Sequence, residues 1–223
     1  PSMLLPAEML AMQMSQMGIE PTDLVVLVPG DAGRDATLVG MALERLGHKH
    51  YAILDGGMGK WIGKNLTVNN ALPAIKKSDY PLTEKSGDDF TVNYQDVLNF
   101  MEQPDTVILD VRPTDYFVGK KSDEARVGHI PGAVNRPYSD DIVEKDGYRR
   151  LRPRKQLAAA YAALIPSKDT RVIVHCRTGH QASQTYFVLK RLLGYSNVLY
   201  YDAGWTEWSA RPQLPVSVGT SGH

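Results

Sequence analysis

The sequence is poor in cysteine, has no long apolar run and carries no net charge. Cys176 is the one cysteine among 223 residues, so no intrachain disulfide can form and a thiolate-rich metal site is not expected. No apolar stretch approaches the roughly 20 residues that cross a bilayer, and the opening residues lack the basic segment of a signal peptide. Lys and Arg together number 25, as do Asp and Glu, which argues against a basic surface for nucleic acid or anionic membranes.

The remaining composition is that of a globular protein, with 43% hydrophobic and 22% charged residues, and the chain repeats itself. Sliding the sequence by 147 positions, without gaps, places Val25 on Val172. At the same offset two Asp-x-Gly-x-x-x-Trp segments coincide, beginning at Asp55 and Asp202. Residues 90–152 have no counterpart, because their partners would precede residue 1. We therefore predict two repeats, the first of them incomplete at its N-terminus.

The segment between the repeats is rich in Lys, Asn, Ser, Asp and Pro and lacks apolar periodicity, which is typical of a linker. The predicted organisation is a first copy at residues 1–64, a linker at 65–89, a second copy at 90–212 and a tail at 213–223. Because half a copy exposes apolar sheet surface, we expect a preceding segment to complete the first copy. A closed and fully covered sheet built from residues 1–64 alone would contradict this expectation.

Apolar runs alternate with segments of helical periodicity through both copies. Strands are predicted at 24–28, 50–54, 106–110, 133–135, 171–175 and 197–200, and longer helices at 34–46, 154–164 and 181–193. This alternation favours an α/β fold in which helices flank a mostly parallel sheet. Ligands of such sheets bind at the carboxyl ends of the strands, where Cys176 is expected to lie.

The residues that follow Cys176 form a short polar loop before the next helix. Loop amides and a helix N-terminus point N–H groups at the residue that leaves the strand, which creates an anion-binding cradle. A thiol there is expected to have its thiolate form stabilised, and such sites allow pKa values of roughly 3.5 to 7.5 instead of about 8.5. Arg177 adds a positive charge, and Gly179 permits a backbone conformation closed to other residues.

Four segments together resemble the tandem-domain rhodanese (thiosulfate sulfurtransferase) family, over residues 6–212. They are Asp110-Val-Arg112, Gly128-His-Ile-Pro-Gly-Ala133, the loop Cys176-Arg-Thr-Gly-His-Gln181 and Asp202-Ala-Gly-Trp-Thr-Glu-Trp208, with Ala203 where the family usually has Gly. The resemblance implies a rhodanese-like parallel sheet flanked by helices and no cofactor or metal. It also implies that Cys176 takes a sulfane sulfur from thiosulfate as a persulfide and passes it to cyanide or a thiol.

The site residues follow from the same segments. Cys176 is the expected nucleophile, and the expected substrate-binding residues are Arg177, Thr178, Gly179, His180, Gln181 and Arg126. Asp110, Arg112 and His129 are expected to support the site, through a salt bridge and backbone hydrogen bonds, rather than to contact substrate. The expected partners are a small anionic sulfur donor and a thiophilic acceptor, without nucleic acid or membrane, and the oligomeric state stays open.

Three other functions compete with this interpretation. The family's 3-mercaptopyruvate sulfurtransferases have Gly, Ser or Thr, and Gly after the cysteine; Arg177 favours thiosulfate, but His180 and Gln181 depart from both loop types. A cysteine phosphatase needs a longer loop that ends in Arg, and Ala182 stands at that position. A non-catalytic rhodanese-like binding module usually lacks the cysteine.

The first copy lacks the chemistry of the second. Pro29 stands where Cys176 stands, and proline has neither a thiol nor an N–H, while Asp31 would repel an anion. We therefore expect an inactive, structural first copy beside an active second one. A lone reactive thiol favours a cytoplasmic location, and a periplasmic one stays open because bacterial relatives occur there.

Overall fold

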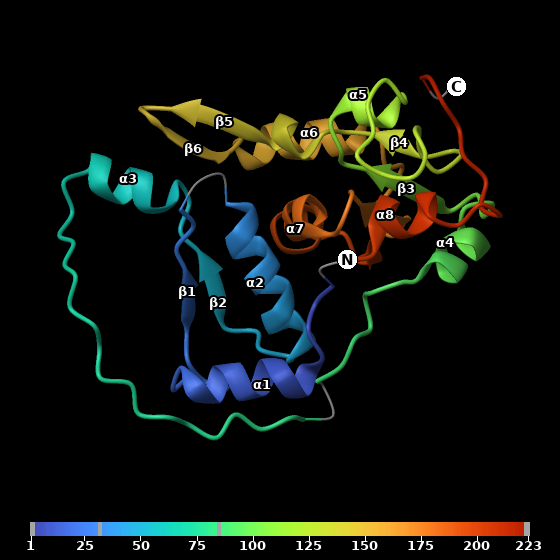
Figure 1. The fold of residues 1–223 in the computed structure, drawn as a ribbon. Coiled ribbons are helices and arrows are strands. Elements are labelled where there is room, and N and C mark those ends of the chain that lie inside the picture. Colours follow the sequence, from blue (N-terminus) through green and yellow to red (C-terminus); the bar gives the residue numbers. More distant parts are fainter. Residues whose placement is uncertain (1–2, 31–32, 84–85, 221–223) are drawn as a thin grey trace. The chain divides into compact units, whose positions relative to one another are not determined.

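The fold was derived from a computed structural model, which describes residues 3–30, 33–83 and 86–220. The chain forms two compact units. The cysteine unit contains residues 90–142 and 152–220, and the amino-terminal unit contains residues 4–89 together with the short segment Val143–Leu151 (Figure 1). No helix in the described ranges combines the length and the apolarity needed to cross a membrane.

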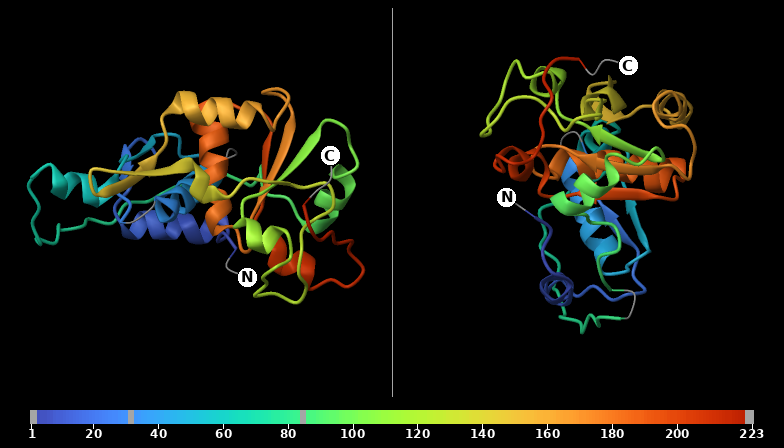
Figure 2. Two further views of the ribbon diagram at one scale, coloured as in Figure 1. Left: turned by 90° about the horizontal axis from the view of Figure 1, so that it is seen from above. Right: turned by 90° about the vertical axis from the view of Figure 1, so that its right-hand side faces the viewer.

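The cysteine unit is built on a four-stranded sheet whose strands are all parallel. Its order is β4 (Val134–Asn135), β3 (Thr106–Asp110), β7 (Arg171–His175) and β8 (Val198–Tyr201). The central strand β7 is an apolar run, and Val172, Ile173 and Val174 are fully buried, as a strand covered on both faces requires. Helices flank this sheet, so the predicted α/β fold is confirmed (Figure 2).

The helices of the cysteine unit are short. They are α4 (Tyr94–Phe100), α5 (Thr114–Phe117), the single 3-10 turn η1 (Tyr138–Asp141), α6 (Arg154–Ala162), α7 (His180–Phe187), its π-helical continuation η2 (Val188–Leu193) and α8 (Gly204–Ser209). The α7–η2 segment ends at Gly194, which has a left-handed backbone (φ 72°), as predicted for a helix terminator.

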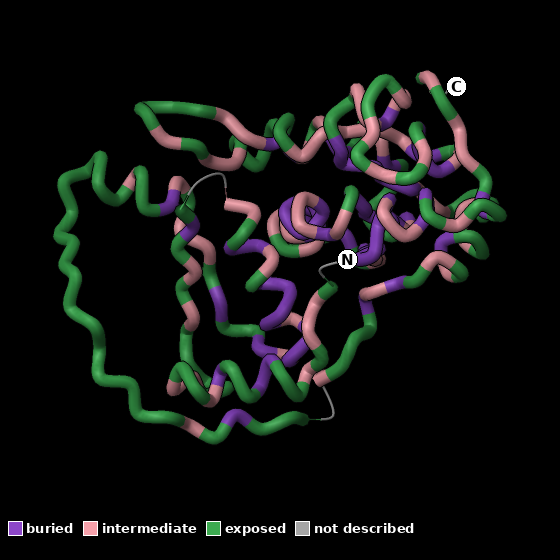
Figure 3. Tube along the Cα trace, viewed as in Figure 1, coloured by how far each residue is buried: buried purple, intermediate pink, exposed green. Residues whose placement is uncertain are grey.

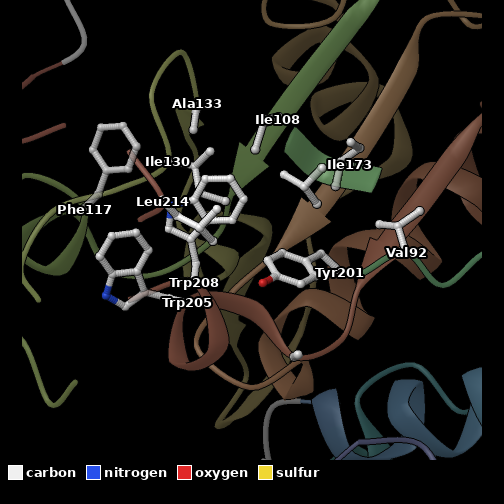
Figure 4. Close-up of a cluster of buried hydrophobic side chains, with 12 residues drawn as sticks. Val92, Ile108, Phe117, Ile130, Ala133, Ile173, Tyr201, Trp205, Trp208 and Leu214 are labelled. Carbon is white, nitrogen blue, oxygen red and sulfur yellow. The ribbon is translucent and has the colours of Figure 1, made fainter. Parts of the chain in front are cut away.

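A cluster of buried apolar side chains joins α8 to the sheet (Figure 4). Trp205 and Trp208, both on α8, are 1% and 0% exposed. Their indole N–H groups donate to the carbonyls of Arg126 (3.2 Å) and Pro215 (2.8 Å), so the polar edge of each ring is satisfied inside the core. Both tryptophans therefore pack and orient the last helix, as the sequence indicates.

The amino-terminal unit contains a smaller sheet. Strands β1 (Val25–Leu27) and β2 (Tyr51–Ile53) pair in parallel, and no other described residue adds a strand to them. Its helices are α1 (Ala7–Gln16), α2 (Arg34–Arg45) and α3 (Gly57–Gly63). Leu24, Val26 and Val28 are 67%, 52% and 50% exposed. One face of this sheet is thus largely exposed among the described residues, whereas Tyr51 of β2 is buried, and the expectation of a completing segment stays a prediction.

The two small strand pairs have equivalent registers. Val25 faces Tyr51 in the amino-terminal unit, and Val172 faces Val198 in the cysteine unit, which is the same pairing at an offset of 147 positions. Helices α1 and α6 begin at equivalent positions, as do α3 and α8. This correspondence supports the predicted duplication.

Two segments of the amino-terminal unit come from outside the predicted first copy. Residues 65–77, within the predicted linker, are exposed and form no helix or strand (Figure 3). The hairpin of β5 (Ile142–Lys145) and β6 (Tyr148–Leu151) turns at Asp146 and Gly147, whose φ values are 55° and 79°. An Asp-Gly pair with positive φ is a strong hairpin signal, which the sequence analysis missed. Tyr148 places its ring 5.8 Å from the Lys60 Nζ on α3.

Candidate active site

Cys176 directly follows β7 and is 1% exposed. The backbone amides of Thr178, Gln181 and Ala182 donate hydrogen bonds to its sulfur. The loop curls around the thiol because Gly179, at the N-terminus of α7, has a φ of 83°. The amide cradle predicted from the sequence is therefore present, and its donors are backbone groups with fixed positions.

Two glycines hold this loop close to its neighbours. A Cβ on Gly179 would collide with the carboxyl group of Asp202 and the hydroxyl of Tyr200. A Cβ on Gly204, whose φ is 55°, would collide with the carbonyl oxygen of Cys176. The next amide along the chain, that of Trp205, donates a hydrogen bond of 2.9 Å to this carbonyl, so the start of α8 is bonded directly to the cysteine loop.

Burial changes the acidity of the cysteine. Loss of solvent raises the pKa of the Cys176 thiol above its ordinary value, and the three amides that contact the sulfur oppose this only in part. The expectation of a lowered pKa is wrong in direction. The three amide dipoles do not replace the hydration that the sulfur loses on burial.

Arg177 does not point its charge at the thiol. Its guanidinium lies 3.6 Å from Glu124 Oε1, and its side chain is 50% exposed. The same Glu124 oxygen accepts a hydrogen bond of 2.8 Å from the hydroxyl of Thr206. Arg177 therefore lies at the mouth of the site, where an anionic ligand can reach it.

Asp110 and Arg112 form a buried, multiply bonded ion pair. Arg112 Nε lies 3.0 Å from each carboxylate oxygen, and its Nη2 also donates to the carbonyl of Gly128 at 2.8 Å. Burial acts to raise the pKa of Asp110, but the charges of His175 and Arg112 outweigh it and hold the pKa below its usual range. The guanidinium stacks 4.5 Å from the centre of the Trp205 ring, so the pair braces the start of α8.

His129 is 1% exposed and stacks on Phe117, with ring centres 3.7 Å apart. Its Nδ1 lies 2.8 Å from the Phe117 carbonyl, and burial lowers its pKa. A neutral ring bonded to backbone fits the supporting position expected for His129.

Arg126 requires a correction. Its guanidinium donates to four backbone carbonyls at 2.8 Å each, those of Trp208, Ser209, Arg211 and Leu214. These bonds hold the C-terminal end of α8 and the segment after it in place. All the guanidinium nitrogens of Arg126 therefore donate to the protein backbone. The expected contribution to substrate binding is therefore wrong, because four carbonyls far along the chain meet at this side chain.

The remaining loop residues lie at the start of α7. His180 is the first residue of α7, and its carbonyl accepts a bond of 2.8 Å from the Ser183 hydroxyl. A cavity of about 300 Å³ opens beside the loop. Its lining includes two cations, two carboxylates and two aromatic rings, from Arg112, Pro113, Tyr116, Ser122, Asp123, Glu124, Arg177, Gln181 and Trp205. No cluster of His, Cys, Asp or Glu suited to a metal ion occurs within the described ranges.

Comparison with known proteins identifies the family. The rhodanese-like domain matches residues 93–211. The chain is 31% identical to the thiosulfate sulfurtransferase of Corynebacterium glutamicum, over 95% of this chain and 72% of that protein. It is 32% identical to the thiosulfate sulfurtransferase of Pseudomonas aeruginosa, over 91% and 73% of the two chains. This chain belongs to the rhodanese-like family.

Solved structures agree with this rhodanese-like fold. YnjE superposes with a TM-score of 0.86 at 26% identity, over 98% of this chain and 54% of that one. The anaerobic ergothioneine biosynthesis enzyme of Chlorobium limicola superposes with a TM-score of 0.82 at 20% identity, over 96% and 56%. The second likeness concerns the fold alone. The chain spans about half the length of these structures.

Two residues of the rhodanese-like site escaped the sequence analysis. His175 is fully buried, its Nε2 lies 3.7 Å from Asp110, and burial lowers its pKa. A histidine at the end of a strand with three consecutive apolar residues was the available signal. Glu124 carried no local signal, because only the fold brings it to Arg177. Asp31, expected to repel anions in the first copy, lies outside the described residues.

Proposed function

We propose that this chain is a sulfurtransferase that moves a sulfane sulfur from thiosulfate to cyanide or a thiol through a persulfide on Cys176. The observation that carries the proposal is the buried sulfur held by the amides of Thr178, Gln181 and Ala182. The names of the relatives, thiosulfate sulfurtransferases at 31% and 32% identity, support the donor.

The proposed first step transfers the outer sulfur of thiosulfate. The Cys176 thiolate attacks that sulfur, the bond between the two sulfur atoms of thiosulfate breaks, and sulfite leaves with the electron pair. The negative charge then resides on the outer sulfur of the persulfide. The fixed amides stabilise negative charge at both stages, because they need no reorganisation when it develops or moves. Arg177 attracts the anionic donor at the mouth of the site.

The proposed second step regenerates the thiolate. Cyanide or a thiolate attacks the outer sulfur, the sulfur–sulfur bond breaks, and Cys176 regains its electron pair as thiocyanate or a new persulfide departs. Residues Thr178, Gly179, His180 and Gln181 are proposed to shape the loop around the transferred sulfur. The first copy is proposed to be inactive and structural, because Pro29 cannot act as a nucleophile.

The test is the intact mass of the reduced protein before and after brief exposure to thiosulfate. We expect a gain of one sulfur atom that cyanide reverses and that Cys176→Ser abolishes. If mercaptopyruvate loads the sulfur and thiosulfate does not, the donor is misassigned. If neither compound adds sulfur, the binding-module function replaces this proposal.

A further inference from the structure

The proposed transfer needs the thiolate of Cys176, whereas the surroundings of the sulfur favour the thiol. Burial raises the pKa of this thiol, the three amides that contact the sulfur lower it only in part, and the charge of Asp110 raises it further. A buried anion is stabilised by a positive charge nearby. The residue directly before Cys176 is a histidine, which can acquire such a charge near neutral pH.

His175 is a fully buried side chain that the proposed transfer steps do not use, and both of its ring nitrogens face acceptors. Its Nδ1 lies 3.2 Å from the carbonyl oxygen of Cys176, and its Nε2 lies 3.7 Å from Asp110 Oδ2. No group in the described part of the chain is hydrogen-bonded to Nε2. A neutral imidazole donates from one nitrogen only and turns a lone pair toward the other acceptor, whereas an imidazolium donates from both nitrogens. The position therefore accommodates a charged ring.

Charged and titratable groups face His175 from both neighbouring strands and from the loops beyond them. The charge of Asp110, on β3, favours a charged ring, and the charges of Arg112 and His129 disfavour it. On β8, the ring centre of Tyr201 lies 6.2 Å from that of His175, and its phenol is uncharged because burial above all raises its pKa. Burial outweighs Asp110 and lowers the pKa of His175, so the ring is neutral beside an uncharged thiol. Because Arg112 already pairs with Asp110, an imidazolium needs a second negative charge, which an ionised sulfur supplies.

We propose that His175 is a positioning residue whose charge follows that of the sulfur. The ring is neutral beside the thiol and becomes an imidazolium when Cys176 is a thiolate or carries a persulfide anion. The proton that leaves the thiol is matched by the proton that the ring takes up, so the thiolate forms without net release of a proton. The ring acts through the Cys176 carbonyl and the Asp110 carboxylate, and no contact with the transferred sulfur is required. This inference rests on the proposed function and specifies how its nucleophile is produced.

The rate at which iodoacetamide alkylates Cys176 in the full chain tests this charge without any sulfur transfer, because the thiolate is the reactive form. A thiol that ionises alone becomes about tenfold more reactive per pH unit below its pKa. A thiolate paired with an imidazolium has a level population between the two pKa values of the pair. Since burial lowers the pKa of His175 and raises that of Cys176, we expect the wild-type rate to change by less than about threefold between pH 7 and pH 8. A rise of about tenfold over this interval would overturn the inference.

Two substitutions at His175 separate the charge of the ring from its hydrogen bond. Asn and Gln carry uncharged amides, whose nitrogens can occupy positions close to Nδ1 and Nε2. His175→Asn and His175→Gln are both expected to react at least about tenfold more slowly than the wild type at pH 7, and to gain about tenfold between pH 7 and pH 8. His50→Gln replaces an exposed histidine of the amino-terminal unit and is expected to keep the level profile. A level profile in either His175 variant would contradict the inference.

Nitrogen-15 NMR of the His175 ring in the wild-type chain provides a readout that needs no variant. At pH 7.5 the ring is expected to be neutral when Cys176 is blocked by iodoacetamide, and to be an imidazolium after thiosulfate has loaded the persulfide. A ring that stays neutral in the loaded protein would overturn the inference and leave the sulfurtransferase function intact. If thiosulfate adds no sulfur, the proposed function fails, and the alkylation profile still decides whether the charge of His175 follows that of the thiol.

Discussion

The strand pairs β1–β2 and β7–β8 have the same register but different surroundings. Val26 of β1 is 52% exposed, whereas Ile173, its counterpart in β7, is fully buried. Ile173 belongs to the apolar cluster that contains Trp205 and Trp208, which covers that face of the sheet, and the edges of the two strands differ as well. Strand β3 pairs along the whole of β7, and no described residue does so for β1. Equivalent sequences thus become a core strand or an exposed one according to what packs on them and pairs with them.

The residues that follow β1 and β7 share one backbone contact but not a chemistry. The carbonyls of Pro29 and Cys176 accept hydrogen bonds, of 3.0 and 2.9 Å, from the amides that follow two left-handed glycines. These are Gly57 (φ 52°) and Gly204 (φ 55°), and a Cβ on either would strike the carbonyl it faces. The same glycine–carbonyl contact therefore lies beside a proline in one unit and beside a buried thiol in the other.

The difference between the two loops is tested most directly by moving the cysteine from the loop after β7 to the loop after β1. If the proposed function holds, Cys176→Ser is expected to lower thiosulfate-to-cyanide transfer by at least about 10³-fold, because the proposed nucleophile is absent. Adding Pro29→Cys to that variant is expected to restore no transfer, measured as thiocyanate formed. Recovery of even a tenth of the wild-type rate would show that the backbone scaffold suffices for catalysis.

Replacing the equivalent residues Ile173 and Val26 by alanine tests whether the two strands differ in burial. Ile173→Ala is expected to cost about 2–5 kcal/mol of unfolding free energy, because it leaves a cavity in the core. Val26→Ala is expected to change the free energy by about 0.5 kcal/mol or less, since its side chain is largely exposed. Urea denaturation of both variants measures the difference. Similar losses would mean that β1 is covered in solution.

Alanine substitutions at two glycines distinguish backbone strain at a positive φ from collision of the new Cβ with neighbouring atoms. Gly179→Ala is expected to destabilise the fold by about 1–3 kcal/mol and to slow persulfide loading, because the new Cβ meets Asp202 and Tyr200. Gly194→Ala is the control, since Gly194 also has a positive φ but no atom near its missing Cβ. Loading rates and denaturation curves are compared. Equal effects of the two variants on loading would exclude the collision.

Acidification is expected to destabilise the cysteine unit gradually. His175 and His129 have pKa values lowered by burial, so the unfolded chain binds more protons than the folded one below about pH 6.5. Stability is therefore full above that pH and falls as the pH decreases, by up to about 1.4 kcal/mol per pH unit and histidine. Urea denaturation at pH 7.5 and 5.5 measures the slope, which His175→Gln is expected to reduce. An unchanged slope in this variant would exclude His175 as a source.

Much of the fold followed from local patterns. The apolar run before Cys176 predicted a buried strand, Gly194 marked a helix end, and Trp205 and Trp208 were expected to pack the last helix. All three are confirmed. The hairpin at Asp146 had an equally local signal and was missed.

Other features had no local cause. Arg126 lies beside a Pro-Gly turn in sequence, and only the folded chain brings the carbonyls of residues 208–214 to its guanidinium. Glu124 reaches Arg177 across more than 50 residues of chain in the same way. The pKa of Cys176 depends on a balance between burial and amide contacts, which is a property of packing.

The sequence by itself determined the cysteine proposed as nucleophile, the strand that it follows and the glycine that lets the loop turn, because each depends on residue type and short-range backbone geometry. The tertiary structure decided the electrostatic environment of the site. The Arg126 guanidinium donates to backbone carbonyls, and Arg177 lies beside the carboxylate of Glu124. Burial raises the pKa of the Cys176 thiol. Electrostatic environments are sums over neighbours in space, and those neighbours are distant in sequence.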